Sequence, residues 1–277
     1  MGALLFCSCG KEQLPVPMKV PVSFVLPPTK ADVVTLTSFR CSCFSGSDWS
    51  PVTDGGAFAD VLFSQSDGVF TGGRYWPSDD PQYHFYASNA RILGSGVSQT
   101  RVHLDKENTA DIVVASCESP SYKTSNSLCF EHITAKVGTI TLVAPDGCLC
   151  SIDANAVKLR GGGGGYYYLH SQSWSDGEGD STTRSFAEAS SWYGSHTLQP
   201  SCTEYFNPSL AYTLEVTYTL SQGGRSVTFT KTGTFRLKQG KKNNLVVTIP
   251  SYAFNFDIDV SVEVLPWEQG GNICETF

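Results

Sequence analysis

The sequence predicts an all-β protein, and three observations support that class. Charged residues make up only 16% of the 277-residue chain, while it holds 26 glycines and 12% aromatic residues, a composition typical of strands and turns. Residues 212–220 and 256–264 alternate strictly between apolar and polar side chains, which indicates strands with one buried and one solvated face. The 40% hydrophobic content suffices for a core, and the length suits one large or two ordinary domains.

The stretch from Leu128 to Gly147 has the most informative pattern. Its apolar positions change phase twice, in three groups: Leu128 and Phe130, then Ile133, Ala135 and Val137, then Ile140 and Leu142. A strand presents one face at a time, so we expect bulges near Glu131-His132 and at Gly138. An amphipathic helix is the alternative, because Cys129, Ile133, Val137 and Ile140 fit a helical spacing. Several β-branched residues and the internal Gly138 favour the strand, and Pro145-Asp146-Gly147 predicts a turn.

The other expected strands are short alternating or β-branched segments. They are residues 20–26, 32–44, 57–63, 68–70, 83–87, 110–115, 152–159, 212–220, 226–230, 235–237, 245–249 and 256–264. Gln222-Gly223-Gly224 and residues 239–243 predict hairpin turns. Gly161 to Gly165 precede three tyrosines, and no GK[ST] follows, so we expect a hairpin loop there and no phosphate cradle.

Composition argues against several function classes. The formal net charge is −7, and no basic stripe suggests a nucleic-acid partner. No apolar run approaches the length that spans a bilayer. The ten cysteines lack the paired CxxC spacing of a zinc site. In a strand, both members of the C-x-C pairs Cys41/Cys43 and Cys148/Cys150 point to one face, so we expect apolar fillers or disulfides, with no metal and no cofactor.

No catalytic constellation stands out. Asp79 and Asp80 precede a proline in a polar segment, which is typical of a solvated turn. Cys129 lies near His132, but strand geometry points them to opposite faces unless the bulge intervenes, so His132 is expected to be a hydrogen-bonded core or edge histidine. The remaining histidines, His84, His103, His170 and His196, form no motif, and neither G-x-S-x-G nor H-E-x-x-H occurs. We therefore predict no enzymatic activity.

The N-terminus is similar to the end of a lipoprotein signal peptide. In MGALLFCSCGKE a short apolar run precedes two cysteines, and Cys9 fits acylation better than Cys7 because small Ser8 precedes it. No positive region comes first and the apolar run is short, which leaves a misplaced start codon or an accidental likeness as alternatives. Residues 1–19 are interpreted as signal remnant and proline-rich tether, so that the chain contacts the membrane only through a lipid anchor.

The polar segment 118–127 is the expected domain linker. It divides the chain into an N-terminal β-sandwich, residues 20–120, and a C-terminal β-sandwich, residues 121–277. Residues 171–199 read as one long polar loop, and such loops are functional or mobile. This loop carries Trp174, Trp192 and Tyr193, which are able to stack on sugar rings or to lie against the sandwich.

Taken in order, these segments resemble the fimbrillin (FimA/Mfa-like) family of Bacteroidales pilus proteins. The resemblance covers residues 20–270. It rests on Tyr75-Trp76-Pro77, residues 83–87 (YHFYA), 111–115 (DIVVA), 128–132 (LCFEH) and 135–137 (AKV), Gly240-Lys241 and Trp267. It implies two tandem transthyretin-like, Greek-key β-sandwiches, export as a lipoprotein, location in fimbriae at the outer membrane, and no catalysis. The implied partners are other pilin subunits, which assemble by strand donation.

Strand donation has a physical basis. A sandwich that lacks one strand exposes unpaired backbone groups and an apolar groove, and a strand from another subunit completes both. In the family a protease removes the first strand after a basic residue, and Lys30 and Arg40 are the candidates here. Arg40 is the better residue type for an arginine-directed protease, and the alternative is that both are ordinary surface charges. The ten residues after Trp267 are short for a separate donor strand. This suggests a tip or accessory subunit, or a stalk subunit if the last strand itself is exchanged.

Two functions follow from the sequence. The first is a structural or adhesive subunit of a surface pilus, with a host or bacterial glycan or protein as receptor. The second is a cell-surface carbohydrate-binding lipoprotein that uses Trp174, Trp192 and Tyr193.

Overall fold

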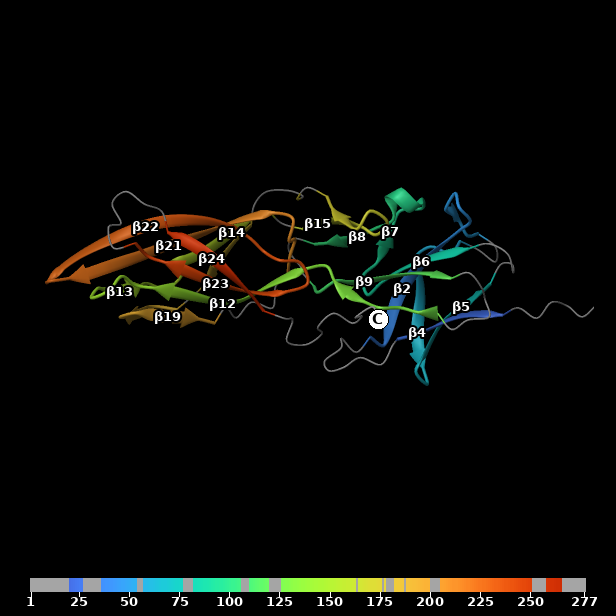
Figure 1. Ribbon diagram of the computed structural model, residues 1–277, viewed down its shortest axis with the longest axis horizontal. Helices are drawn as coiled ribbons and strands as arrows, with labels where there is room; N and C mark the ends of the chain where they lie inside the picture. The colour runs from blue at the N-terminus through green and yellow to red at the C-terminus, as the bar shows by residue number, and fades with distance from the viewer. Residues whose placement is uncertain are drawn as a thin grey trace, which may run out of the picture.

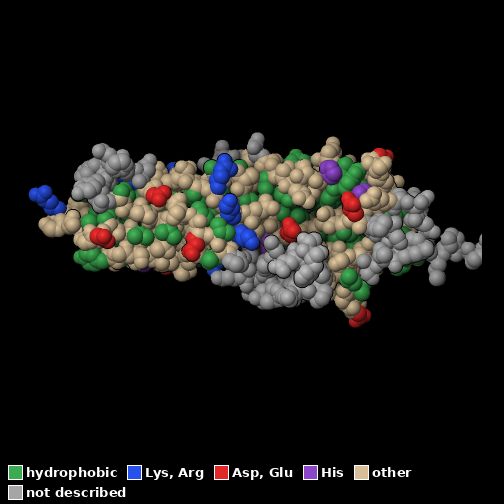
Figure 2. Space-filling model, viewed as in Figure 1, with side chains coloured by type: hydrophobic (Ala, Val, Ile, Leu, Met, Phe, Trp, Pro, Cys, Tyr) green, Lys and Arg blue, Asp and Glu red, His purple; other side chains and the backbone are tan. Residues whose placement is uncertain are grey.

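The protein is described here by a computed structural model. It describes residues 20–26, 36–53, 57–76, 82–105, 110–119, 126–162, 164–175, 177, 182–186, 188–199, 205–250 and 258–265. Within these ranges, strands and one 3₁₀ turn make up all the regular structure. The molecule is elongated, and its N-terminal and C-terminal strands occupy opposite ends of the long axis (Figure 1). Acidic side chains are scattered over the face in Figure 2, whereas most of the basic ones form a short row near its middle and another lies at the left end.

None of the helical structure in the described ranges has the length and apolarity that a membrane span needs.

The N-terminal end is built on a nine-stranded sheet. Its strands are β1 (Pro21–Val25), β2 (Ser38–Ser45), β3 (Ser50–Pro51), β4 (Val61–Ser66), β5 (Val69–Tyr75), β6 (Tyr83–Ser88), β9 (Val113–Ser119), β10 (Asn126–Ser127) and β11 (Glu131–His132), in the order β10-β1-β5-β4-β2-β6-β9-β11 with β3 beside β2. The sheet curls around a phenylalanine-rich core, because Phe24 of β1 lies 5.1 Å from Phe85 of β6 between ring centroids.

A small sheet covers the outer face of this curled sheet. It consists of β7 (Ile92–Leu93), β8 (Arg101–Leu104), β15 (Gly165–Tyr168) and β16 (Ser173–Trp174), with the 3₁₀ turn η1 (Val97–Gln99) beside it. Tyr167 and Leu169 pack with Phe44 and Tyr86 in a second core. All six residues of β6 are therefore buried, on both faces of the strand.

The C-terminal end is a sandwich of two sheets. One contains β12 (Ala135–Val143), β19 (Ser195–Leu198), β20 (Tyr205–Phe206), β23 (Lys242–Thr248) and β24 (Asp259–Leu265). The other contains β13 (Leu149–Ile152), β14 (Val157–Gly161), β17 (Thr182–Phe186), β18 (Ser190–Trp192), β21 (Ala211–Gln222) and β22 (Arg225–Arg236). Their facing side chains form one core, which confirms the all-β, sandwich-like fold class.

The stretch from Leu128 to Gly147 forms strands, and within it the chain passes from one sheet to another. At Gly138 the pairing of β12 with β23 shifts register between Val137 and Ile140, which confirms the predicted bulge. The first phase change has a different cause: β11 pairs with β9 in the N-terminal sheet, whereas β12 starts the C-terminal sandwich. The predicted bulge at Glu131-His132 was wrong. The chain passes from the N-terminal sheet to the C-terminal sandwich near residue 133.

Two predicted hairpins were wrong because the chain changes sheet there as well. After the glycine run, β15 pairs with β8 in the small sheet and not with β14. After residues 239–243, β23 pairs with β12 and β24 and not with β22. The hairpin at Gly223-Gly224 is confirmed, since both glycines have positive φ (59° and 75°) between the paired β21 and β22.

Two other predicted segments were also divided differently. The single strand expected over 152–159 is interrupted after β13 by a turn at Asn155, with φ of 62°. The long loop expected over 171–199 contains β16, β17, β18 and β19, which lie at the ends of three different sheets. Strands this short carry too few residues for periodicity to reveal them.

Candidate functional site

Strand β1 lies inside the N-terminal sheet. It pairs antiparallel with β5 and parallel with β10. The Trp76 amide donates to the carbonyl of Val20, and the Leu128 amide donates to the carbonyl of Val25, so both edges of the strand are hydrogen-bonded. Its alternation VSFV buries Val22 and Phe24 and leaves Ser23 and Val25 half-buried. The strand thus fills a slot that its neighbours define.

Phe24 is the centre of that slot. The ring is fully buried and meets Phe39, Phe63 and Phe85 edge-to-face, at centroid distances of 5.9, 5.2 and 5.1 Å. Edge-to-face pairs add attraction between the positive ring edge and the negative ring face. Removal of β1 would leave an apolar cavity between three aromatic rings and two unpaired strand edges, a form complementary to another strand.

The two predicted cleavage residues differ in their setting. Arg40 lies within β2, where it is paired with Leu62 of β4 on one side and Ser88 of β6 on the other. Its guanidinium donates to the carbonyl and to a carboxylate oxygen of Asp60, both at 3.1 Å. Lys30 lies outside the described residues, as do Cys9 and the Asp79-Asp80 pair.

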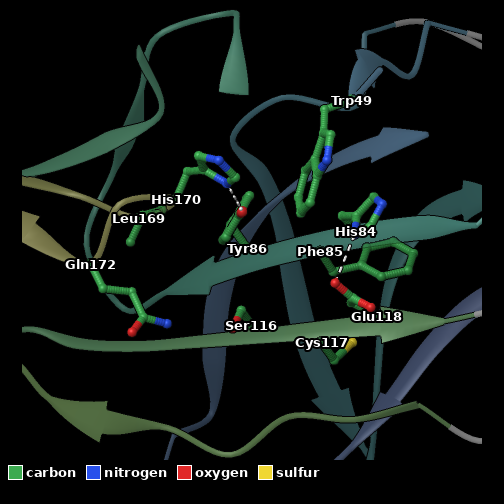
Figure 3. A pocket seen from close by; sticks show the side chains of 10 residues that line it. All are labelled: Trp49, His84, Phe85, Tyr86, Ser116, Cys117, Glu118, Leu169, His170 and Gln172. Carbon is green, nitrogen blue, oxygen red and sulfur yellow. Dashed lines mark hydrogen bonds and ion pairs between the residues drawn. The ribbon is translucent and has the colours of Figure 1, made fainter. Parts of the chain in front are cut away.

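A polar and aromatic cavity opens on the other face of the same sheet (Figure 3). It measures about 320 Å³, and β6, β9 and two turns contribute its lining. Those lining residues are Trp49, His84, Phe85, Tyr86, Ser116, Cys117, Glu118, Leu169, His170 and Gln172. Figure 3 shows Trp49 above the strands, between His170 on one side and His84 on the other.

Aromatic contacts hold the upper part of this cavity together. The indole of Trp49 stacks on His84 with ring centroids 3.5 Å apart, and it meets His170 edge-on at 4.8 Å. The hydroxyl of Tyr86 is hydrogen-bonded to Nδ1 of His170 at 2.8 Å. Burial, followed by the nearby Glu118 carboxylate, raises the pKa of Tyr86 to about 12, so the phenol stays protonated and neutral at physiological pH.

The sequence did not group these residues. Residues 49, 84, 118 and 170 are distant along the chain, and only the sheet pairing and the covering small sheet bring them together. A usable signal was present in β6, where Tyr-His-Phe-Tyr places bulky side chains on both faces. A strand of that kind must be covered on both sides.

The three aromatic residues predicted as ligand contacts do not come together. Trp174 of β16 packs edge-to-face on Tyr167 at 5.4 Å in the small sheet. Trp192 of β18 is buried in the C-terminal sandwich, where it stacks on His196 at 5.0 Å. Tyr193 beside it is exposed. Both tryptophans therefore lie against the sheets, which was the alternative to sugar stacking.

The cysteines and His132 have structural environments. Cys129 is disulfide-bonded, and the other cysteines within the described ranges are free thiols: Cys41, Cys43, Cys117, Cys148 and Cys150. All five are buried or half-buried. The buried His132 lies with Nδ1 2.7 Å from a carboxylate oxygen of Asp111, whose other oxygen accepts from Thr134 at 2.8 Å. His132 is thus a paired buried histidine at the junction of the two ends.

Comparison with known families decides the assignment of the fold. The profile of the fimbrillin-like family matches residues 49–267, which is most of the chain. The chain belongs to the fimbrillin-like family. This confirms the resemblance derived from the sequence, and it supports a pilus or adhesion protein at the cell surface. No curated protein sequence matches the chain.

Solved structures share the fimbrillin-like architecture at low sequence identity. A fimbrial protein from Bacteroides vulgatus aligns with a TM-score of 0.61 at 14% identity, covering 87% of this chain and 99% of that one. A candidate cell adhesion protein from Parabacteroides distasonis aligns with a TM-score of 0.51 at 11% identity, covering 88% and 97% of the two chains. At these identities the likeness concerns the fold.

Proposed function

We propose that this fimbrillin-like protein is a structural or adhesive subunit of a surface fimbria that polymerises by donor-strand exchange. The protein is exported as a lipoprotein acylated at Cys9, and proteolysis after a basic residue releases β1. A strand from another subunit then occupies the vacated slot. The sequence leaves the position in the fibre open between a stalk subunit and a tip or accessory subunit.

The observation that carries this proposal is the buried position of the Phe24 ring in the core of the N-terminal sheet. A strand of five residues, β1, supplies a fully buried aromatic ring to a core that the other strands of the sheet otherwise complete. Because β1 is short, it makes few contacts. A replacement strand with an apolar residue in the position of Phe24 can restore most of them.

The surroundings of Arg40 favour Lys30 as the cleaved residue. A protease binds its substrate as an extended, unpaired segment, and the backbone around Arg40 is paired on both sides within β2. Cleavage after Arg40 would require this strand to open first. It would also remove Phe39, which packs against Phe63, Phe70 and Phe130 in the same core.

The test is limited proteolysis of the purified protein with an arginine- and lysine-specific protease. Unboiled electrophoresis in SDS should then show a ladder of multimers, and N-terminal sequencing should find Ala31. Lys30→Gln should abolish the ladder, while the matched variant Arg40→Gln should retain it. Monomers alone after complete removal of β1 would overturn the polymerising function.

A sugar-binding function through Trp174, Trp192 and Tyr193 is not favoured. The two indoles are engaged in separate packing clusters.

A further inference from the structure

The cavity above β6 and β9 differs in location from the assembly slot. Along β9, Ala115 and Cys117 point into the phenylalanine core, whereas Ser116 and Glu118 point to the outer face. The cavity lies over that outer face and therefore on the side opposite to Phe24. Its volume of about 320 Å³ is at the lower end of the range for small-molecule sites, about 300–1,000 Å³.

Unusual backbone conformations converge on this cavity. Five described non-glycine residues have positive φ, and three of them are Asp or Asn, which tolerate the left-handed region. The other two are Trp49 at 56° and Gln172 at 51°. Both line the same cavity although they come from different parts of the chain. Such conformations persist where the surrounding structure over-determines them, and they concentrate at ligand sites.

His84 gives an independent sign of a missing partner. The residue is 4% exposed, and neither ring nitrogen has a hydrogen-bond partner among the described residues. Nδ1 lies at ion-pair distance, 3.4 Å, from a carboxylate oxygen of Glu118 (Figure 3), so Nε2 is the ring nitrogen left without a partner among the described residues. Buried polar groups are nearly always satisfied, so Nε2 of His84 has the capacity for one further hydrogen bond.

The polar lining selects the ligand chemistry. The Glu118 carboxylate only accepts hydrogen bonds, the Ser116 hydroxyl donates and accepts, and the Gln172 amide does both through separate atoms. An amine would satisfy only acceptors, and an anion would be repelled by Glu118. A hydroxyl group serves both kinds of partner, so a neutral polyhydroxylated molecule matches this lining.

We propose that this cavity binds a neutral monosaccharide unit of a surface glycan. The inference rests on the adhesive part of the proposed function and deepens it by naming the ligand class. It also moves sugar recognition from Trp174, Trp192 and Tyr193 to the cavity on the outer face of the N-terminal sheet. Trp49 closes the cavity from above, and Gln172, Ser116 and Glu118 receive the hydroxyls of the sugar from below (Figure 3).

The test is saturation-transfer-difference NMR on the full chain with the methyl glycosides of glucose, galactose, mannose, fucose and N-acetylglucosamine at millimolar concentration. At least one glycoside should give saturation transfer. Trp49→Gly and Gln172→Gly remove each side chain while glycine accepts the positive φ, so both variants should fold, which circular dichroism verifies. Each should weaken binding at least tenfold, and Tyr193→Ala, at an exposed aromatic elsewhere, should leave it unchanged.

Three results would overturn the inference: no glycoside binds, binding survives both glycine variants, or binding is lost in Tyr193→Ala. Binding of methylated amines in place of the glycosides would likewise reject the sugar class. The assembly function is measured separately, because Trp49→Gly should still form the SDS-resistant ladder. A ladder without sugar binding would reject this inference alone, and sugar binding without a ladder would reject only the polymerisation.

Discussion

Replacement of Phe24 by alanine measures how firmly β1 is seated. The ring is fully buried and contacts three aromatic rings within 6 Å between centroids. Truncation of a buried phenylalanine costs about 3–5 kcal/mol, because apolar contacts are lost and a cavity remains. We expect a loss near the middle of this range, roughly 4 kcal/mol, which corresponds to about three powers of ten in the equilibrium between the seated and released strand.

The assay is urea unfolding of the uncleaved protein, followed by circular dichroism, with the free energy of unfolding taken from the midpoint and slope. Ser23→Ala is the matched control, because the neighbouring Ser23 is only half-buried on the other side of β1. It should change the unfolding free energy by less than about 0.5 kcal/mol. A loss below about 1 kcal/mol for Phe24→Ala would refute the conclusion that β1 fills an essential part of the core.

Other regions give further predictions. Gly161→Ala should lower the free energy of unfolding by about 1–3 kcal/mol in thermal unfolding through overpacking, because a Cβ there meets the buried ring of Tyr212. Gly96→Ala, with open space around the added Cβ, should be nearly neutral, and equal losses in the two variants would contradict this packing. Iodoacetamide should label Cys117 only on unfolding, since burial raises the pKa of its thiol to about 12, and rapid labelling of the folded protein would argue against it. Burial likewise raises the pKa of Tyr218 from 10.0 to about 12, so this tyrosine deprotonates in the unfolded chain before it does in the folded protein. Its contribution to stability should therefore be complete below pH 10 and fall as the pH approaches 12. A denaturation midpoint that stays constant over this range would disprove this prediction.

The sequence predicted strands well where one face is buried and the other is wet. Period-two alternation found β21, and the glycine pair after it specified its hairpin, because turn geometry and side-chain direction are local properties. The bulge at Gly138 was found for the same reason. The sheet that each strand joins, by contrast, is not determined by local sequence. A bulge and a switch of sheet would both produce the phase change at Ile133. Only long-range packing distinguishes the two causes.

The cavity could not be predicted for the same physical reason. In the sequence His84 and His170 were visible only as isolated residues. Their meeting depends on β15 pairing with β8, which carries the turn with His170 over β6. Conversely, Trp174 and Trp192 stood out in a polar background, but they pack into two separate clusters because short strands in that background join different sheets.

The most direct measurement of the central claim is immunogold electron microscopy of the producing cells with antibodies against this chain. A fimbrial subunit should place gold on extended surface fibres, at intervals along them for a stalk subunit or at one end for a tip subunit. Gold confined to the cell envelope, on cells that carry fibres, would contradict the assignment.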